Sequence, residues 1–182
     1  MSLPREVEPQ AENCTYQYDD DALQPGDPQA VIPWSDAVAR LSAANLFWLA
    51  TIRPDGRPHL RPLFAVWVDG QLCTTTNPAV GKGRNLAADG RCSASTSTDQ
   101  VDFVVEGTAA PVTDPDHLQR VFDAYRSKYG WPAAIVDGAF DAPFGAPTAG
   151  PPPYVPYAIT PETVYGIGTS DDLAPRSTRW RF

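Results

Sequence analysis

Short runs of apolar and β-branched residues, separated by turn formers, dominate the middle of the chain, a pattern typical of β-strands. Residues 47–53 form the first run, and the Pro-Asp-Gly sequence at 54–56 supplies a preset φ and a glycine that tolerates positive φ. An Asp-Gly pair at 69–70 is a second hairpin signal, because both residues adopt positive φ readily. We therefore expect two consecutive hairpins, the last strand covering residues 71–76.

The strand between these turns, residues 57–68, carries Pro58 and Pro62. Because proline cannot donate a hydrogen bond to a ladder, we expect this strand to bend or to place both prolines at an edge or bulge. Residues 63–68 (LFAVWV) are almost wholly apolar, which predicts burial on both faces. Further strands are predicted at residues 91–98, 101–112, 157–159, 163–167 and 177–182, with Gly107 marking a bend or bulge.

Two short helices are predicted around the first strands. Ser35 is the expected N-cap of one, which carries an apolar stripe of Val38, Leu41 and Leu46 and would cover an opening of a small barrel. The other follows the last strand of the second hairpin, runs for about two turns and ends at Gly90.

A third helix begins at Asp114-Pro115, an N-cap residue followed by a first-turn proline, and ends at Gly130. Its apolar stripe, with i, i+3, i+4, i+7 spacing, consists of Leu118, Val121, Phe122 and Tyr125. We expect this helix to pack on the barrel and to leave Tyr125 and Tyr129 partly exposed.

Two segments lack such patterns. Residues 1–33 are rich in proline and acidic side chains, so we expect either a disordered segment or an extended arm anchored by Tyr16, Tyr18 and Ile32. Residues 137–156 are rich in proline and glycine and predict an irregular loop. The aromatic residues of this loop, Phe140, Phe144 and Tyr154, favour a lid over a substrate pocket. Residues 34–182 remain as one domain.

Composition narrows the class of protein. The 182 residues include 14 basic and 22 acidic side chains, a net charge of −8, which argues against nucleic acid as a partner. The three cysteines are widely spaced and lack neighbouring histidines, so neither a disulfide framework nor a metal site is expected. The N-terminus has no apolar signal core and no run approaches ~18 apolar residues, so we expect a cytoplasmic protein without a membrane partner.

Candidate chemistry gathers after the strand at 71–76. Its last hydroxyl residues, Thr74, Thr75 and Thr76, precede Lys82 and Arg84 at the start of a short helix. Hydroxyls, free backbone N–H groups and two cations suit a phosphate. The alternative is that these are ordinary strand threonines and solvated charges, because no glycine-rich phosphate-loop consensus is present.

No hydrolytic motif is present. The two histidines, His59 in a strand and His117 in the first turn of a helix, are not near a serine or cysteine nucleophile in sequence. We expect structural or surface roles for both, with His117 solvated. Cys73 and Cys92 fall within strand patterns and are expected to be buried small hydrophobes.

Residues 46–112, with DAYRSKYGW at 123–131 and TRWRF at 178–182, resemble the pyridoxamine 5'-phosphate oxidase-like split-barrel flavoproteins, in particular their actinobacterial flavin- and deazaflavin-dependent oxidoreductases. The resemblance spans about residues 35–182. It implies a mainly β fold with flanking helices, namely a six-stranded split β-barrel of the FMN-binding type, in a homodimer.

The resemblance also implies a set of cofactor contacts. Phosphate and ribityl groups would meet Lys82, Arg84 and Asn85, with Thr75 and Thr76 as donors at the strand end. Arg61 and Pro62 would approach the ring. Arg179 would reach the flavin of the partner subunit, with Trp180 as a wall or stacking surface; the alternative for this pair is a structural cation–π or interface contact.

The implied activity is hydride transfer between a bound cofactor and a small, largely apolar unsaturated substrate. We favour coenzyme F420 over FMN, and Arg57 and Arg84 would then meet the carboxylates of its tail. Pyridoxamine phosphate is a doubtful substrate, because the basic residues typical of those oxidases are fewer here. No catalytic residue is evident, although Tyr154 and Tyr157 are candidate proton donors. The competing hypotheses are a non-enzymatic flavin or tetrapyrrole carrier and a haem protein with His59 as axial ligand.

Overall fold

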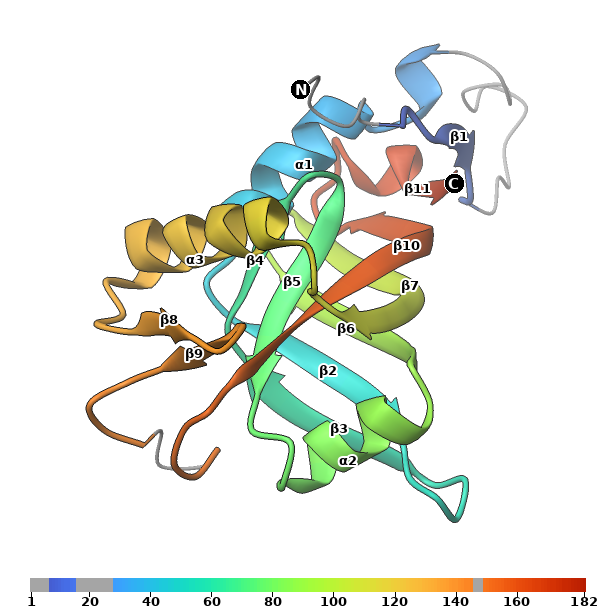
Figure 1. Cartoon of the computed structure of the whole chain (residues 1–182). Coiled ribbons are helices and arrows are strands. Elements are labelled where there is room, and N and C mark those ends of the chain that lie inside the picture. Colours follow the sequence, from blue (N-terminus) through green and yellow to red (C-terminus); the bar gives the residue numbers. More distant parts are fainter. Residues whose placement is uncertain (1–6, 16–27, 146–148) are drawn as a thin grey trace.

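The computed structural model describes residues 7–15, 28–145 and 149–182. Within these ranges, one large β-sheet curls into a barrel and three α-helices lie against it (Figure 1). None of the helices in the described ranges combines the length and the hydropathy that a membrane span requires. Tyr16 and Tyr18, two expected anchors of the N-terminal arm, lie outside the described residues.

The main sheet runs in the order β1-β11-β10-β7-β6-β2-β3, and β5 joins β10 to β4. The strands of this sheet are β1 (Gln10–Asn13), β2 (Phe47–Ile52), β3 (Pro58–Leu63), β4 (Ala65–Val68), β5 (Gln71–Thr76), β6 (Arg91–Ser97), β7 (Val101–Pro111), β10 (Val155–Gly168) and β11 (Thr178–Arg181). A separate hairpin consists of β8 (Ala134–Val136) and β9 (Ala139–Asp141). All pairings are antiparallel.

Strand β10 closes the barrel because its two halves have different neighbours. Residues 155–159 pair with β5, whereas residues 163–166 pair with β11, and β7 lies along the whole length of the other side. The register shifts between Pro161 and Thr163, opposite Gly107. The expected irregularity at Gly107 of β7 is therefore present, although the extra residue lies in β10, between Pro161 and Thr163. A Cβ on Gly107 would lie only 2.1 Å from the Thr160 carbonyl oxygen.

The expected turns and edge are confirmed. Gly56, Asp69 and Gly70 have φ angles of 80°, 52° and 76°, as the two hairpins require. Strand β3 lies at the end of the sheet order, so Pro58 and Pro62 occupy an edge where their missing N–H groups cost little.

The helices are α1 (Trp34–Ala43), α2 (Gly81–Ala88) and α3 (Pro115–Tyr129), with short 3₁₀ turns at Pro28–Ala30 and Ala174–Arg176. The prediction of Ser35 as N-cap is wrong: the N-cap position is Pro33, two residues earlier, and no side chain caps the helix. Helix α3 begins as predicted, with the Asp114 side chain accepting from the His117 N–H and Gly130 in the left-handed conformation at its end.

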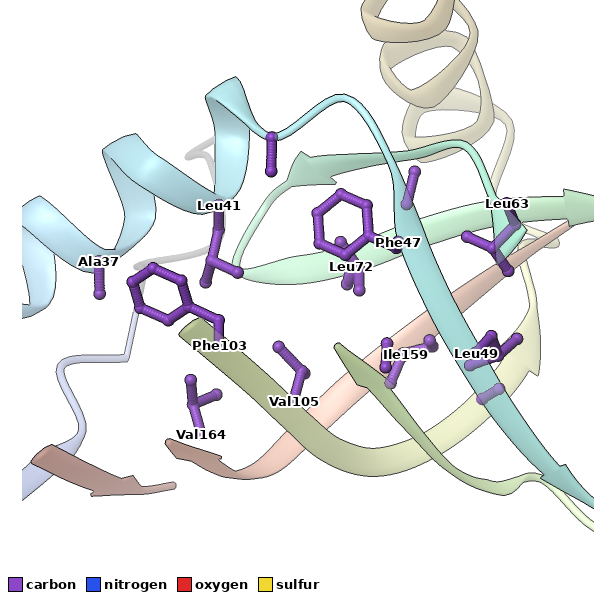
Figure 2. Close-up of a cluster of buried hydrophobic side chains, with 14 of the residues drawn as sticks. Ala37, Leu41, Phe47, Leu49, Leu63, Leu72, Phe103, Val105, Ile159 and Val164 are labelled. Carbon is purple, nitrogen blue, oxygen red and sulfur yellow. The ribbon is translucent and has the colours of Figure 1, made fainter. Parts of the chain in front are cut away.

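Two apolar clusters hold the domain together. Figure 2 shows the larger one, in which Leu41 of α1 points from the helix into the cluster beside Phe103; Phe47 and Leu72 belong to the same cluster. The smaller cluster lies between α3 and the strands β4, β5 and β10. Tyr125 belongs to this second cluster and is 3% exposed, so the expectation that it is partly exposed is wrong. Its hydroxyl donates to the Phe64 carbonyl oxygen at 2.6 Å, which explains why a polar tip is tolerated there.

The described residues of the segment 137–156 contain more regular structure than the predicted irregular loop. Its residues 139–141 form β9, and Phe140 pairs with Tyr154 in an isolated bridge. Both aromatic side chains are buried in the second cluster, whereas Phe144 is exposed. Two of the three aromatic residues that suggested a lid are therefore core residues. Tyr157, proposed with Tyr154 as a proton donor, is also buried.

Candidate functional site

The candidate site lies at the end of the barrel formed by the β2–β3 turn and α2 (Figure 1). The chain turns into α2 through Asn77, whose Oδ1 accepts the Ala79 N–H at 2.7 Å. No side chain caps the helix that follows. The first-turn N–H groups of α2 thus have no side-chain acceptor, which is the condition for an anion site at a helix N-terminus.

A glycine is required where α2 meets this turn. A Cβ on Gly83 would lie 2.3 Å from the Asn77 carbonyl oxygen and 2.8 Å from the Pro78 Cα, both of which are backbone atoms. The close approach fixes α2 against the end of β5. It also explains the glycine at position 83 although no phosphate-loop consensus is present.

A cavity of about 480 Å³ opens beside the N-terminus of α2. Its lining residues come from the β2–β3 turn, β3 and α2, and they are Arg53, Pro54, Asp55, His59, Gly81, Arg84 and Asn85. A second cavity of about 260 Å³ borders the same turn and is lined by Ala50, Thr51, Ile52, Gly56, Pro58, Arg91, Cys92 and Ser93. The β2–β3 turn therefore separates a polar cavity from a mainly apolar one.

Arg53 and Arg84 line the polar cavity, and Arg61 and Lys82 lie close enough to His59 to lower its pKa. Arg53, Arg61, Lys82 and Arg84 make no ion pair within the described parts of the chain. Asp55, the acidic residue of the lining, is engaged by Arg57 at 2.6 Å. The Arg57 hydrogen bonds lower the pKa of Asp55. The side chains around the cavity thus carry a net positive charge, although the whole protein has a net charge of −8.

Lys82 is partly buried in this region, and its amine donates to the Thr75 carbonyl oxygen at 3.2 Å. Burial lowers the pKa of Lys82 to about 8. A desolvated ammonium held by one neutral carbonyl is stabilised by an added anion. Arg84 is exposed and donates to the Ala79 carbonyl oxygen.

A buried polar chain forms the floor of the cavity. The Asn85 amide donates to Thr51 Oγ1 at 3.0 Å, and Thr51 Oγ1 lies 3.4 Å from His59 Nδ1. Thr51 and His59 are directly opposite each other on β2 and β3. Desolvation, followed by the charges of Arg61, Arg53 and Lys82, lowers the pKa of His59.

The structure brings part of the predicted site together. Asn85 and Arg84 line the cavity, and Lys82 is tied to Thr75 beside it. Thr76 is fully buried, and its hydroxyl donates to the Asn77 carbonyl oxygen, so it supports the turn into α2. Arg61 and Pro62 lie exposed on the neighbouring edge strand β3.

The other two predicted residues lie elsewhere. Arg179 and Trp180 are on β11, at the opposite end of the molecule from α2 (Figure 1). The Trp180 side chain is 0% exposed and packs against Trp34 and Phe103, so it occupies the position of a core residue. Arg179 is paired with Glu12 of β1, a strand that the sequence pattern did not predict.

Sequence reasoning missed Arg53, Thr51 and His59 as members of this site. Thr51 and His59 sit on the same face of adjacent strands only because the Pro-Asp-Gly turn sets that register. The signal was present in the hairpin, since residues paired across a tight turn can be counted outwards from it. The contact between α2 and His59 could not be predicted in this way, because it joins segments that are not paired across a turn.

The prediction that His117 is solvated is wrong. Its Nδ1 lies 2.9 Å from Asp69 Oδ2, and its Nε2 lies 3.7 Å from Cys73 Sγ. Arg120 donates to the same Asp69 oxygen at 2.7 Å. Cys73 is fully buried, as expected, and burial raises its pKa to about 12, so this thiol is not a nucleophile.

Solved structures with a similar fold come from several bacteria. A conserved hypothetical protein of Mycobacterium tuberculosis matches with a TM-score of 0.57 and 21% identity, over 78% of this chain and 88% of that one. A FAD-binding protein of Mesorhizobium loti matches with a TM-score of 0.54 and 21% identity, over 83% and 95%. A heme-binding protein of Mycobacterium smegmatis matches with a TM-score of 0.54 and 17% identity, over 78% and 57%.

Identities of this size show a shared fold and nothing more. No curated protein sequence matches the chain. The family model described as pyridoxamine 5'-phosphate oxidase matches residues 35–168, which include strands β2 to β10, the polar cavity, and helices α2 and α3. With this match and the split-barrel topology, the chain belongs to the pyridoxamine 5'-phosphate oxidase family.

Proposed function

We propose that this protein is an oxidoreductase that binds FMN or coenzyme F420 and reduces or oxidises a small unsaturated organic substrate, such as a conjugated carbonyl compound or an imine. The observation that carries the proposal is the cluster of unpaired cations at the uncapped N-terminus of α2. A phosphate-bearing cofactor would neutralise these charges. Family membership and the similarity to a FAD-binding structure are consistent with such a ligand.

The bound cofactor would supply hydride transfer, through C5 of a deazaflavin ring or N5 of a flavin ring. The residues of this chain would bind and orient it. Lys82 and Arg84 would hold the phosphate, and Asn85 would meet the ribityl hydroxyls from the cavity wall. Arg61 and Pro62 would border the ring along β3, where the exposed edge leaves room for a planar group.

We also propose that the working form is a homodimer. Cross-strand pairing places Arg179, Tyr165, Val104, Ser95, Trp48 and Pro62 in one row on the same face of the sheet. Four strands separate β11 from β3, so Arg179 lies roughly 24 Å along the sheet from the edge that carries Arg61. It cannot reach a ring at that edge within one chain.

A second copy would both cover this face and bring its own Arg179 to the cofactor. Trp48 and Leu60 are exposed side by side on the face, at 45% and 49%, which is unusual for large apolar side chains. Sedimentation equilibrium tests the dimer. We expect wild-type protein to be dimeric and Trp48→Glu to be monomeric with weakened cofactor binding, whereas a wild-type monomer would refute the dimer.

The alternative function is a carrier that binds a flavin or haem without turnover. It is favoured by the His59 side chain at the cavity and by the similarity to a heme-binding structure. A haem-bound form would show a Soret band that is lost in His59→Ala.

The deciding experiment is a fluorescence titration of the purified protein with FMN and with F420. We expect micromolar or tighter binding of at least one cofactor, weakened at least tenfold in Lys82→Ala and by less in the exposed Arg84→Ala. Lys128→Ala is the matched control, because Lys128 lies on α3 away from the cavity and should leave the affinity unchanged. Binding of neither cofactor would refute the proposed function.

A further inference from the structure

We propose that His59 is a proton-linked contact for a terminal phosphate monoester and takes up a proton when this dianion enters the cavity beside α2. The inference rests on the proposed function, because it assumes that the polar cavity holds the cofactor phosphate. It adds the ligand class that the cavity prefers and a role for a histidine that the sequence pattern marked as structural.

The position of His59 is that of a ligand contact. The residue is only 9% exposed, and it lines the cavity. Its Nδ1 faces Thr51 at 3.4 Å, whereas its Nε2 has no hydrogen-bond partner in the described ranges of the chain. The Cε1–Nε2 edge of the ring faces the first residue of α2, because a Cβ on Gly81 would lie 3.6 and 3.8 Å from these two atoms. A ring nitrogen without a partner, on a residue that is 9% exposed, thus points at an uncapped helix N-terminus.

The charges that face His59 come from every element around the cavity. They are Arg53 at the end of β2, Arg61 on β3, Lys82 and Arg84 on α2, and Asp55 in the turn, whose carboxylate is taken by Arg57. These cations and the loss of solvent disfavour the imidazolium, so the ring is neutral at pH 7 without a ligand. A neutral ring with a free Nε2 is able to accept a proton once the electrostatic potential at the ring becomes more negative.

A terminal phosphate monoester makes that change. It carries a charge near −2 above its second pKa of about 6, while a phosphodiester carries a single charge. A dianion in direct contact with Nε2 acts at shorter range than the surrounding cations and favours the imidazolium, which then donates from both ring nitrogens. FMN ends in a monoester, whereas the phosphate of F420 is a diester that continues into the tail. The cavity therefore suits FMN better than F420, contrary to the preference drawn from sequence resemblance.

Nuclear magnetic resonance provides the direct test, because the chain has only two histidines. The ring signals of ¹⁵N-labelled full-length protein are followed against pH, first alone, then with inorganic phosphate, and then with FMN. We expect the His59 pKa to lie below 6.5 in the free protein and to rise by at least one pH unit with either ligand. His117 is the internal control, since it is paired with Asp69 away from the cavity and should not respond.

The binding equilibrium gives a second measurement. Between pH 6.5 and 7.5 the monoester is mostly dianionic and Lys82, with a pKa of about 8, is mostly protonated with or without ligand, so the proton taken up on binding is that of His59. FMN affinity should therefore fall as pH rises, by up to tenfold per pH unit. The slope should be lost in His59→Gln, kept in His117→Gln, and absent for riboflavin, which lacks the phosphate. F420 should show a shallower slope.

The outcomes separate the two proposals. If FMN binds and depends on Lys82, but the His59 pKa does not move and His59→Gln keeps the slope, the inference fails while the proposed function stands. If neither FMN, F420 nor inorganic phosphate binds, both fail. Should His59→Gln not fold, the histidine titration of the wild-type protein still decides the matter.

Discussion

The region around the polar cavity and the region around α3 contain the same residue types in opposite circumstances. The chain has two lysines and two histidines, and each region holds one of each: Lys82 and His59 beside α2, and Lys128 and His117 on α3. Burial lowers the pKa of both lysines to about 8. Residue type and burial therefore do not distinguish the two regions.

The polar groups of the α3 region are paired within the chain. His117 and Arg120 share the Asp69 carboxylate, which ties the start of α3 to the β4–β5 turn. Lys128 donates to the Ala65 carbonyl oxygen at 3.0 Å and lies over the rings of Phe47 and Tyr129. These contacts stabilise the helix on the sheet and leave little for a ligand to satisfy.

The cations beside α2, by contrast, have no carboxylate partner among the described residues, and His59 has a free ring nitrogen. The cost of holding like charges together is tolerated where a ligand relieves it. The comparison shows that the pairing of a charged group, more than its burial, separates a structural cluster from a binding site. Changes to each region should therefore affect different properties.

The largest effect is expected from Gly83→Ala, which places a Cβ against the backbone of the Asn77 turn. Either α2 or the turn must move, at a cost of about 2 to 3 kcal/mol in the free energy of unfolding. The FMN affinity should fall more than tenfold, because the first turn of α2 leaves its position. Urea unfolding and FMN titration measure the two quantities.

Gly81→Ala is the matched control, since its Cβ would meet only the His59 ring at ordinary contact distance. Its free energy of unfolding should change by less than about 1 kcal/mol. Equal destabilisation by the two variants would show that the Gly83 contact does not constrain α2.

An intermediate effect is expected from Asp69→Asn in the α3 region. The change removes the negative partner of His117 and Arg120, whose side chains are largely buried around it. We expect a loss of about 1 to 3 kcal/mol in the free energy of unfolding, with FMN affinity unchanged.

Asp55→Asn supplies the comparison, because the Asp55–Arg57 ion pair is exposed and should contribute only about 0 to 1 kcal/mol. Both variants are measured by urea unfolding at one pH. A drop in FMN affinity in Asp69→Asn as large as that in Lys82→Ala would contradict the division between the two regions.

The smallest effect concerns the pH dependence of stability. The folded-state pKa of Lys82 is about 8 and its unfolded value is near 10.4, so the unfolded chain binds more protons between these values. Stability should therefore rise with pH in this window, and Lys82 should contribute about 1 kcal/mol of the rise between pH 8 and 9. Lys128 acts in the same direction.

Saturating FMN should cancel the contribution of Lys82 alone, because a bound phosphate holds its amine protonated. Unfolding curves of wild type, Lys82→Met and Lys128→Met, with and without FMN, measure this. If FMN also cancels the contribution of Lys128, the lysine on α3 is part of the binding region and the comparison breaks down.

Much of the fold could be predicted because its signals are local. The Pro-Asp-Gly and Asp-Gly turns, the edge prolines of β3 and the Asp114 cap all depend on φ, ψ preferences within a few residues. Lys82, Arg84 and Asn85 could be assigned to one place for the same reason, since they lie within one turn of one helix.

The remainder depended on contacts between distant segments. The end of β1 that carries Glu12 pairs with Arg179, Tyr125 is enclosed by α3 and the strands below it, and Trp180 fills the barrel end. The residues next to Glu12, Tyr125 and Trp180 in the sequence do not indicate which distant segments these three contact. Burial and pairing are properties of the packed chain, so a residue-by-residue pattern cannot assign them.

His59 and His117 illustrate the difference between what the local sequence determines and what contacts between distant segments determine. By itself the sequence determined that one histidine follows a tight hairpin turn and that the other lies in the first turn of a helix, because turn and cap chemistry is local. Only the tertiary structure decided that His117 meets a carboxylate while His59 lies near the cations Arg53, Arg61 and Lys82 and faces an uncapped helix. Electrostatic surroundings are summed over space, and they include Lys82 beside His59 and Asp69 beside His117, charges that lie far from these histidines in the chain.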